Sequence, residues 1–206
     1  MHTEFVKYRE SMPSVVQLPQ LDYTYKEMAH VMAPEMLDLH YAKLHQGYID
    51  RYNKAQSTMK MTQLVYTPEK EEEKALLFNL GGYLNHTLFW KSISPKKEFH
   101  TPSEKMLSMI NASFPRGLCK EMVDILPRIR GSGWIWVTYS RATELLQLET
   151  TMNQDFPKTP VLLNVDLWEH SYLMQYHSDK AKYVTSVYSI LNWKFASERL
   201  EQILNE

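Results

Sequence analysis

The sequence predicts an α+β fold in which two long helices come first, three strands follow, and helices return at the end of the chain. Two stretches of the first half carry apolar residues at three- and four-residue steps, the spacing of amphipathic helices. Later, the segments GWIWVTYS and ELLQLETT alternate as strands of an antiparallel hairpin do, and PVLLNV supplies a third strand. Internal repeats and low-complexity segments do not interrupt this order.

The first long helix is expected to begin near Pro34, because a proline at a helix start removes only an N–H that would be unpaired there. Residues 19–28, which include Pro19, read as an extended segment before it. Between about residues 50 and 70 the periodicity fades. The positions expected to share one inward face are Met36, Leu37, His40, Leu44, Gly47 and Tyr48.

The second long helix is expected to follow Pro68 and to end near Trp90. Acidic residues favour the first turn of a helix, where the backbone dipole is positive, and here they are Glu69, Glu71, Glu72 and Glu73. The charged run at this start is interpreted as solvated helix surface. The inner face is expected to run through Asn79, Gly82, Tyr83, His86 and Trp90.

The second half begins with short elements. Prolines between Pro95 and Gly133 separate short apolar runs, which predicts several short helices joined by turns. The strand hairpin is expected to turn at Arg141 and Ala142. After Asp166 the pattern is helical again, with one stripe through Val184, Val187, Tyr188 and Leu191 and another through Ala196, Leu200 and Ile203.

Composition excludes several classes of protein. A chain of 206 residues can bury a substantial core, and the single cysteine, Cys119, rules out an internal disulfide framework, which disfavours secretion. A net charge of -1 without a basic patch argues against nucleic acid as a partner, and no apolar run is long enough to cross a membrane. The first residues, MHTEFVKYRESMPSVV, fit poorly with a transit peptide, so the cytoplasm is favoured over the mitochondrial matrix.

The candidate site begins with the segment DLWEH, where Asp166 precedes His170 by four residues at a strand-to-helix junction. Taken alone, Asp166 could cap a helix and His170 could be a hydrogen-bonded core histidine. However, His40 and His86 also lie on inward helix faces, where an imidazole without a partner would be costly. Three imidazoles and one carboxylate suit iron or manganese. The other histidines are interpreted as exposed or structural: His2, His30, His45, His100 and His177.

These residues carry a resemblance to a known family. The segment LPQLDYTYKEMAHVMAPEMLDLHYAKLHQGY, then NHTLFW, GSGWIWV, NQD and DLWEHSY, resembles in order the signatures of the iron/manganese superoxide dismutases. The resemblance implies an amino-terminal long helical hairpin over residues 18–94, after an extension over residues 1–17. An α/β domain with a three-stranded antiparallel sheet would follow over residues 95–206. One ion per subunit would be held by His40, His86, Asp166 and His170.

The resemblance also implies roles around the ligands. Tyr48 corresponds to the tyrosine at the gateway of the site, Trp134 and Trp168 to the pocket walls, and Gln154 to the residue that hydrogen-bonds metal-bound solvent. Trp134 and Trp168 can also be interpreted as ordinary aromatic core, which is compatible with their role as pocket walls. Glu169 resembles the acid that reaches across a dimer to the partner's ligand histidine, here His170.

The identity of the ion is expected from the position of one glutamine. Iron-type members of the family usually carry glutamine four residues before the second-helix ligand, where this chain has Gly82. Manganese-type members carry it where this chain has Gln154. Manganese is therefore preferred as the cofactor, and iron is the alternative.

The chain departs from the family at three positions. Leu44 and Leu173 stand where the family usually has a histidine and a tyrosine that hydrogen-bond across the subunit interface. With both partners apolar no donor or acceptor is orphaned, so this altered interface pair predicts a dry contact. Lys180 stands at the substrate funnel in place of an arginine. The lysine keeps the positive charge but lacks the planar guanidinium group, which can form two parallel hydrogen bonds.

The function that the resemblance implies is the conversion of superoxide anion to dioxygen and hydrogen peroxide, by a homodimer or tetramer. The alternative is a superoxide dismutase fold recruited as a non-catalytic structural or assembly subunit, which metal content would distinguish. A metal site for other small-molecule redox chemistry is a third reading that no residue specifically favours.

Overall fold

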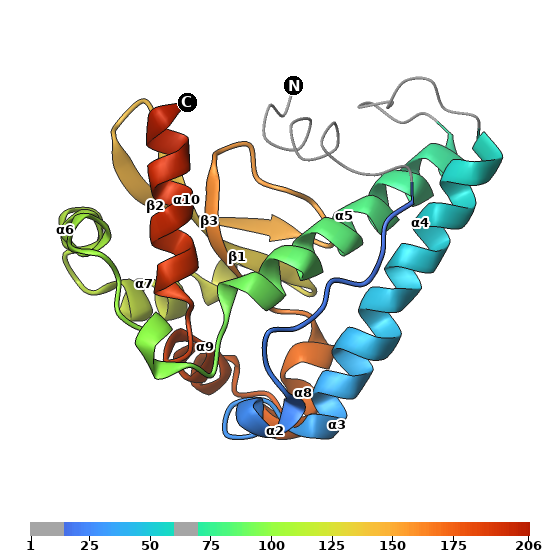
Figure 1. The fold of residues 1–206 in the computed structure, drawn as a ribbon, viewed down its shortest axis with the longest axis horizontal. Coiled ribbons are helices and arrows are strands. Elements are labelled where there is room, and N and C mark those ends of the chain that lie inside the picture. The colour runs from blue at the N-terminus through green and yellow to red at the C-terminus, as the bar shows by residue number, and fades with distance from the viewer. Residues whose placement is uncertain (1–14, 60–69) are drawn as a thin grey trace.

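The computed structural model describes residues 15–59 and 70–206, and its first part is dominated by a long pair of antiparallel helices (Figure 1). A continuous helical rod runs from Pro34 through three successive pieces, and the second long helix packs along it. The elements are α2 (Tyr25–Met28), α3 (Pro34–Leu37), the π-helical segment η1 (Asp38–His45), α4 (Gln46–Met59) and α5 (Glu71–Ser92). The predicted helical hairpin is confirmed.

The second part is a three-stranded sheet surrounded by short helices. Before the sheet come η2 (Lys97–Phe99), α6 (Glu104–Ser113), α7 (Leu118–Asp124) and η3 (Leu126–Arg128). The strands are β1 (Gly133–Ser140), β2 (Leu145–Met152) and β3 (Val161–Asp166). After the sheet come η4 (Glu169–Ser171), α8 (Leu173–Tyr176), α9 (Lys180–Tyr188) and α10 (Trp193–Asn205).

The sheet has the order β2-β1-β3, and both pairings are antiparallel. β3 is thus an edge strand, and α5 packs against it (Figure 1). The register sets Trp134 opposite Asp166 and Trp136 opposite Asn164. This contact between α5 and β3 joins the helical hairpin to the sheet, and it brings the middle of the second long helix to the end of the third strand.

Two apolar clusters hold these parts together. The larger one fills the space between the sheet, α5 and the carboxy-terminal helices, and includes the fully buried Trp134, Trp136 and Phe89. The smaller one lies between α4 and α5 and includes Val16, Ile49 and Leu80. Of the helices in the described ranges, none has both the length and the apolar character that crossing a bilayer requires.

Two local expectations were wrong, and one helix extends into a stretch where the sequence pattern fades. The segment 19–28 is not extended throughout: Thr24 and Glu27 form a reciprocal capping box that starts the short helix α2. Helical structure continues through Met59, beyond the point where the periodicity fades. The strand hairpin turns over residues 141–144 and not at Arg141 and Ala142 alone, because Glu144 adopts a left-handed conformation (φ 56) before β2 begins.

Two of the expectations fall on residues outside the described ranges. Most of the expected extension lies in residues 1–14, and the expected start of the second helix at Pro68 lies in residues 60–69. The division of the chain at residues 17 and 94 therefore stays a prediction. Both helices of the hairpin nevertheless carry a buried histidine, His40 in η1 and His86 in α5.

Candidate metal centre

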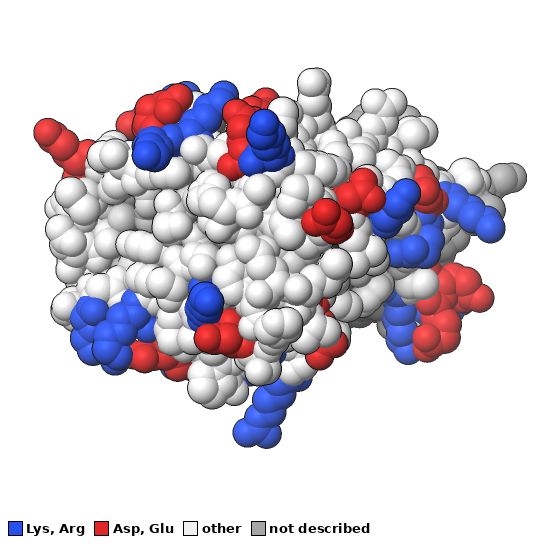
Figure 2. All heavy atoms as spheres, turned by 90° about the horizontal axis from the view of Figure 1, so that it is seen from below, with Lys and Arg blue, Asp and Glu red and all other residues white. Residues whose placement is uncertain are grey.

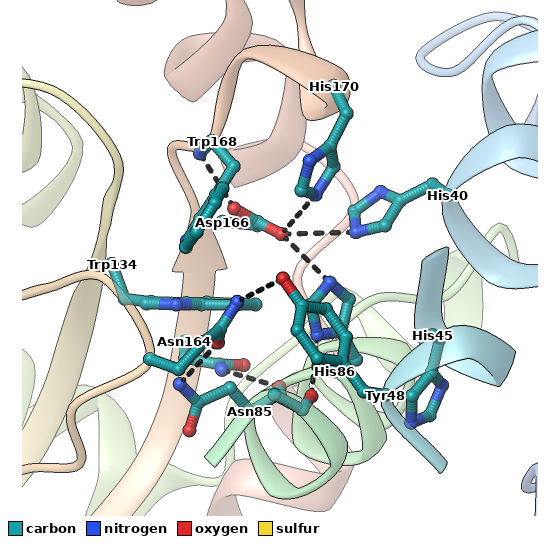
Figure 3. Close-up of polar contacts among 12 residues, drawn as sticks. His40, His45, Tyr48, Asn85, His86, Trp134, Asn164, Asp166, Trp168 and His170 are labelled. Carbon is teal, nitrogen blue, oxygen red and sulfur yellow. Dashed lines mark hydrogen bonds and ion pairs between the residues drawn. The ribbon is translucent and has the colours of Figure 1, made fainter. Parts of the chain in front are cut away.

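Four side chains from four elements meet at one point, at the end of β3 (Figure 3). η1 supplies His40, α5 supplies His86, the end of β3 supplies Asp166 and η4 supplies His170. One potential ligand atom from each lies within 4.8 Å of all the others. The Nε2 atoms of His40, His86 and His170 lie 3.0, 3.5 and 3.3 Å from Asp166 Oδ2. The predicted residues therefore converge.

The hydrogen bonding of His86 leaves a free lone pair at the point of convergence. Its Nδ1 lies 2.6 Å from the Gly82 carbonyl, which can only accept, so Nδ1 carries the proton and Nε2 does not. Among the described residues, His40 Nε2 and His86 Nε2 are buried without a partner in hydrogen-bond geometry. Orphaned buried nitrogens are costly, and a cation at this point would satisfy both. The donor set therefore fits a metal ion.

Burial and mutual proximity keep three of the donors, His40, His86 and Asp166, in the protonation states that a metal requires. Burial, with the proximity of His170, lowers the pKa of His40 to about 4. Burial and the neighbouring His40 hold the pKa of His86 well below its usual range. Burial opposes ionisation of Asp166, but His170 and His40 outweigh it and hold the carboxyl pKa below its usual range. Neutral imidazoles around a carboxylate are the metal-binding forms.

A chain of side-chain amides borders the ligands. Gln154 Nε2 donates to the Tyr48 hydroxyl at 3.0 Å, and Asn85 Nδ2 donates to Gln154 Oε1 at 3.0 Å. Tyr48 and Gln154 are 6 % and 4 % exposed. Burial raises the pKa of Tyr48, and the hydrogen bond from Gln154 only partly opposes this, so the hydroxyl keeps its proton at neutral pH.

Two consecutive glycines allow α5 to approach this amide chain. A Cβ at Gly81 would lie 2.2 Å from the Gln154 carbonyl oxygen. A Cβ at Gly82 would lie 2.4 Å from a carbon of the Tyr48 ring. Since neither contact is sterically allowed, only glycine fits at both positions. The closeness of α5 to Tyr48 and Gln154 therefore depends on Gly81 and Gly82.

Aromatic rings wall the site. Trp134 is fully buried against His86, and the indole N–H groups of Trp134 and Trp168 both donate to the Asn153 carbonyl, at 3.0 and 3.1 Å. Phe78 was not singled out from the sequence, because its place in the helical pattern did not distinguish it. Its ring, 41 % exposed, lies 5.9 Å from that of Tyr48 and 6.3 Å from that of Trp168, at the outer rim.

His45 also belongs to the surroundings of the site, although the sequence reading grouped it with the exposed or structural histidines. It is fully buried and stacks on the candidate ligand His86 with ring centroids 5.3 Å apart. Trp90 Nε1 donates to its Nδ1 at 3.1 Å, so its Nε2 carries the proton that is donated to the Tyr83 carbonyl at 3.1 Å. His45 is thus structural, and it supports a ligand.

The π-helical segment η1 explains why His45 was missed. An α-helical repeat from His40 places Leu44 on the inward face, but η1 is π-helical, with wider turns closed by i→i+5 hydrogen bonds, and its buried residues are His40 and His45. Accordingly His45 is fully buried and Leu44 is only half-buried. Leu44 and Leu173, the altered interface pair, both reach the surface of the single chain, and Leu173 is 47 % exposed.

The two remaining predicted residues lie outside the ligand cluster. Glu169 is exposed, and it directly precedes the candidate ligand His170. Lys180 is half-buried, with its ammonium group 5.4 Å from the centre of the Tyr172 ring. Neither is among the residues that converge on Asp166.

Comparison with known proteins gives a consistent result over nearly the whole chain. The sequence model described as "Iron/manganese superoxide dismutases, alpha-hairpin domain" matches residues 16–94, and that described as "Iron/manganese superoxide dismutases, C-terminal domain" matches residues 102–199. "Superoxide dismutase [Mn] 2, mitochondrial" of Arabidopsis thaliana is 33% identical over 204 residues, covering 94% of this chain and 84% of that protein.

Two fungal relatives agree. "Superoxide dismutase [Mn], mitochondrial" of Aspergillus niger is 33% identical over 202 residues, covering 91% of this chain and 94% of its own. The protein of the same name from Schizosaccharomyces pombe is 34% identical over 188 residues, covering 88% of this chain and 86% of its own. With both halves matched in order and the histidine–aspartate cluster in place, the chain belongs to the iron/manganese superoxide dismutase family.

Proposed function

We propose that this chain is a working superoxide dismutase that holds one manganese ion through His40, His86, Asp166 and His170. The observation that carries the proposal is the pair of buried Nε2 atoms, of His40 and His86, that lack hydrogen-bond partners among the described residues and face the Asp166 carboxylate. A non-catalytic scaffold would have no need to keep such a costly arrangement. The family to which the chain belongs and the names of its relatives support the same activity.

A bound redox-active ion would supply the one-electron exchange with superoxide in both directions. The chain's own residues would supply the rest. Tyr48 accepts its hydrogen bond from Gln154, so its own O–H is free to donate toward the site, and its raised pKa keeps that proton in place. The rings of Trp134, Trp168 and Phe78 would exclude large molecules from the site and admit only small ones. The Lys180 ammonium would favour the approach of an anion.

The proposal is tested by elemental analysis and a dismutation assay on the purified full chain. Near-stoichiometric manganese or iron together with dismutation of superoxide would support it. A folded, metal-free and inactive protein would contradict it and would favour the scaffold alternative.

Manganese is expected to give the more active enzyme. Gln154 supplies the amide next to Tyr48, and Gly82 leaves no room for a glutamine from α5. The metal-free protein is reconstituted separately with manganese and with iron, and activity per bound ion is measured across pH. We expect manganese to give at least about tenfold higher activity per ion, because the surroundings of a metal set its potential. Higher activity with iron throughout would overturn the preference.

A homodimer is proposed as the smallest assembly. In the view of Figure 2 the centre of one face is largely free of charged residues, and α8, with Leu173 and Met174 47 % and 55 % exposed, lies on that side in Figure 1. Depletion of charged residues is typical of the core of a subunit interface. In the family's arrangement Glu169 would reach His170 of the other subunit, beside a twofold axis.

Replacing Glu169 with alanine is therefore expected to weaken the dimer and the metal site together, since one hydrogen bond would serve both. We expect the dimer dissociation constant to rise about tenfold, measured by analytical ultracentrifugation at low concentration, and metal to be lost faster. The control is Glu198→Ala, which removes an exposed acid paired with Lys194 on α10. A Glu169→Ala protein as dimeric and as metal-loaded as the control would count against the role.

Leu44 and Leu173 are expected to meet across the same interface. Leu44→His or Leu173→Tyr alone would bury an unpaired polar group there and weaken the dimer, by about 1–3 kcal/mol each. The double substitution should recover much of that loss, because the two polar groups can pair. Dimer dissociation constants of the four proteins measure the coupling directly. Strictly additive effects would show that the two leucines do not touch.

The compartment is also a proposal. The relatives described above are named as mitochondrial proteins, and their names favour the mitochondrial matrix over the cytoplasm expected from the sequence. Subcellular fractionation followed by immunodetection of the full chain distinguishes the two.

A further inference from the structure

A buried polar cluster joins α5 to β3 between the two ligands that these elements carry. Asn164 and Ser92 are 1 % and 0 % exposed, and neither was singled out in the sequence. Asn164 precedes ligand Asp166 by two residues, so both side chains lie on the same face of β3. Ser92 ends the helix that carries ligand His86. The cluster therefore lies where the spacing of two metal ligands is set.

The hydrogen bonds fix the orientation of the Asn164 amide. Its Nδ2 donates to the Asn85 carbonyl at 2.9 Å, and a carbonyl can only accept, so the nitrogen must face Asn85. Its Oδ1 then faces the Ser92 hydroxyl at 3.1 Å. The single hydroxyl proton of Ser92 is shared between Asn164 Oδ1 and the Leu88 carbonyl, 2.9 Å away.

The Asn164 backbone takes part as well. β3 is an edge strand, and the Asn164 N–H donates to Ser92 Oγ at 3.1 Å, whereas in an inner strand such a group would pair with another strand. Both the backbone and the side chain of Asn164 are thus attached to α5. A slide of β3 along α5 would break three buried hydrogen bonds together.

The cluster continues directly into the site. Asn85, which receives the bond from Asn164, is the residue before ligand His86, and its side chain donates to Gln154 Oε1. Gln154 in turn donates to Tyr48. Figure 3 shows Asn85 and Asn164 beside the ligands, with Tyr48 at the other end of the chain of amides.

We propose that Asn164 is a positioning residue of the metal centre: by fastening β3 to α5 through Asn85 and Ser92, it sets the distance between His86 and Asp166 and holds Asn85 against Gln154. The inference rests on the proposed function, because it concerns the same ion. A role in stability alone predicts a less stable protein with an unchanged metal site. A positioning role predicts that the metal site changes beyond what the loss of stability explains.

The test uses the manganese-loaded full chain. Asn164→Ala is compared with Asn53→Ala, a matched control whose amide also donates to and accepts from one backbone segment, at Val16, away from the ligands. The loss of manganese to excess EDTA and the visible absorption of the oxidised enzyme are measured with the unfolding midpoint. We expect Asn164→Ala to lose manganese about tenfold faster than wild type, with a shifted absorption band. Asn53→Ala should stay within about twofold, with an unchanged band.

Equal rates of manganese loss and equal spectra for the two variants would overturn the inference. Ser92→Ala keeps the test decisive if Asn164→Ala does not fold. It removes the hydroxyl that holds Asn164 but leaves the hydrogen bond from Asn164 to the Asn85 carbonyl. Manganese loss should therefore be faster than in the wild type, by a smaller factor than in Asn164→Ala. A wild-type rate of manganese loss in Ser92→Ala would overturn the inference. A wild-type chain that binds no manganese would instead overturn the proposed function.

Discussion

Replacing His86 with alanine is expected to abolish metal binding at working concentrations and, with it, activity. His86 supplies one of four converging donors, and its Nε2 is the ring nitrogen left to bind an ion because Nδ1 donates to the Gly82 carbonyl, so the alanine variant would leave three donors. Losing a residue that merely supports a ligand costs about 10–100-fold in affinity, and losing a ligand should cost at least as much. Metal content by mass spectrometry and the dismutation rate are the measurements.

The matched control for His86→Ala is His100→Ala. His100 also binds a backbone carbonyl through a ring nitrogen, with Nε2 2.6 Å from Ser94 O, but it lies outside the ligand cluster. It should therefore keep its metal and its rate. If the His86→Ala protein retained full occupancy and activity, the assignment of all four ligands would have to be revised, because they are defined by their convergence on one point.

The candidate ligands in the long helices and in β3 could be predicted from the sequence because these elements have a clear inward face, whereas His170 lies in the three-residue η4 and was expected from the DLWEH segment and the family resemblance. His86 lies within a long α-helix, and Asp166 ends a buried strand, so their directions follow from periodicity. His40 precedes most of the π-helical segment, and its inward position was still correctly expected. The fold class followed from the same patterns, since the long helices and the alternating strands are strong local signals.

The supporting residues were harder to predict because their positions depend on tertiary contacts. His45 faces inward from the π-helical segment η1, a departure from the α-helical repeat that no local pattern indicates. Asn164 reads as one polar residue in an apolar strand, and its partners Ser92 and Asn85 are more than seventy positions earlier. Pairings between residues so distant in sequence become visible only when α5 is placed on β3.

Gly82→Ala is the substitution in which two physical effects oppose each other most directly. Glycine within a helix costs about 1 kcal/mol relative to alanine, so the change should stabilise α5 if nothing stood in the way. However, the new Cβ would lie 2.4 Å from Tyr48 Cδ1 and 2.5 Å from Cγ, at the base of the ring, where the side chain cannot swing aside without moving its backbone. The steric effect should therefore dominate.

Overpacking of a buried site costs about 1–3 kcal/mol, and a displaced Tyr48 would also lose the hydrogen bond from Gln154, at a further cost of about 1 kcal/mol. After the gain in helix propensity, we expect Gly82→Ala to lower the free energy of unfolding by roughly 1–3 kcal/mol. A misplaced Tyr48 should lower the dismutation rate by about tenfold or more. Denaturant unfolding and the rate per bound manganese are the measurements.

Gly47→Ala provides the control, because Gly47 is also a helical glycine and the atoms nearest to its added Cβ belong to the guanidinium end of Arg51, the closest at 3.0 Å. That end donates to Asn79 and lies over the Tyr48 ring, but it is the far end of a flexible side chain and can shift by a few tenths of an ångström, so Gly47→Ala should be close to neutral, within about 1 kcal/mol. Equal stabilisation in both variants would show that the Tyr48 ring can yield. In that case Gly82 would no longer exclude a side chain from α5, and the preference for manganese over iron would lose its steric basis.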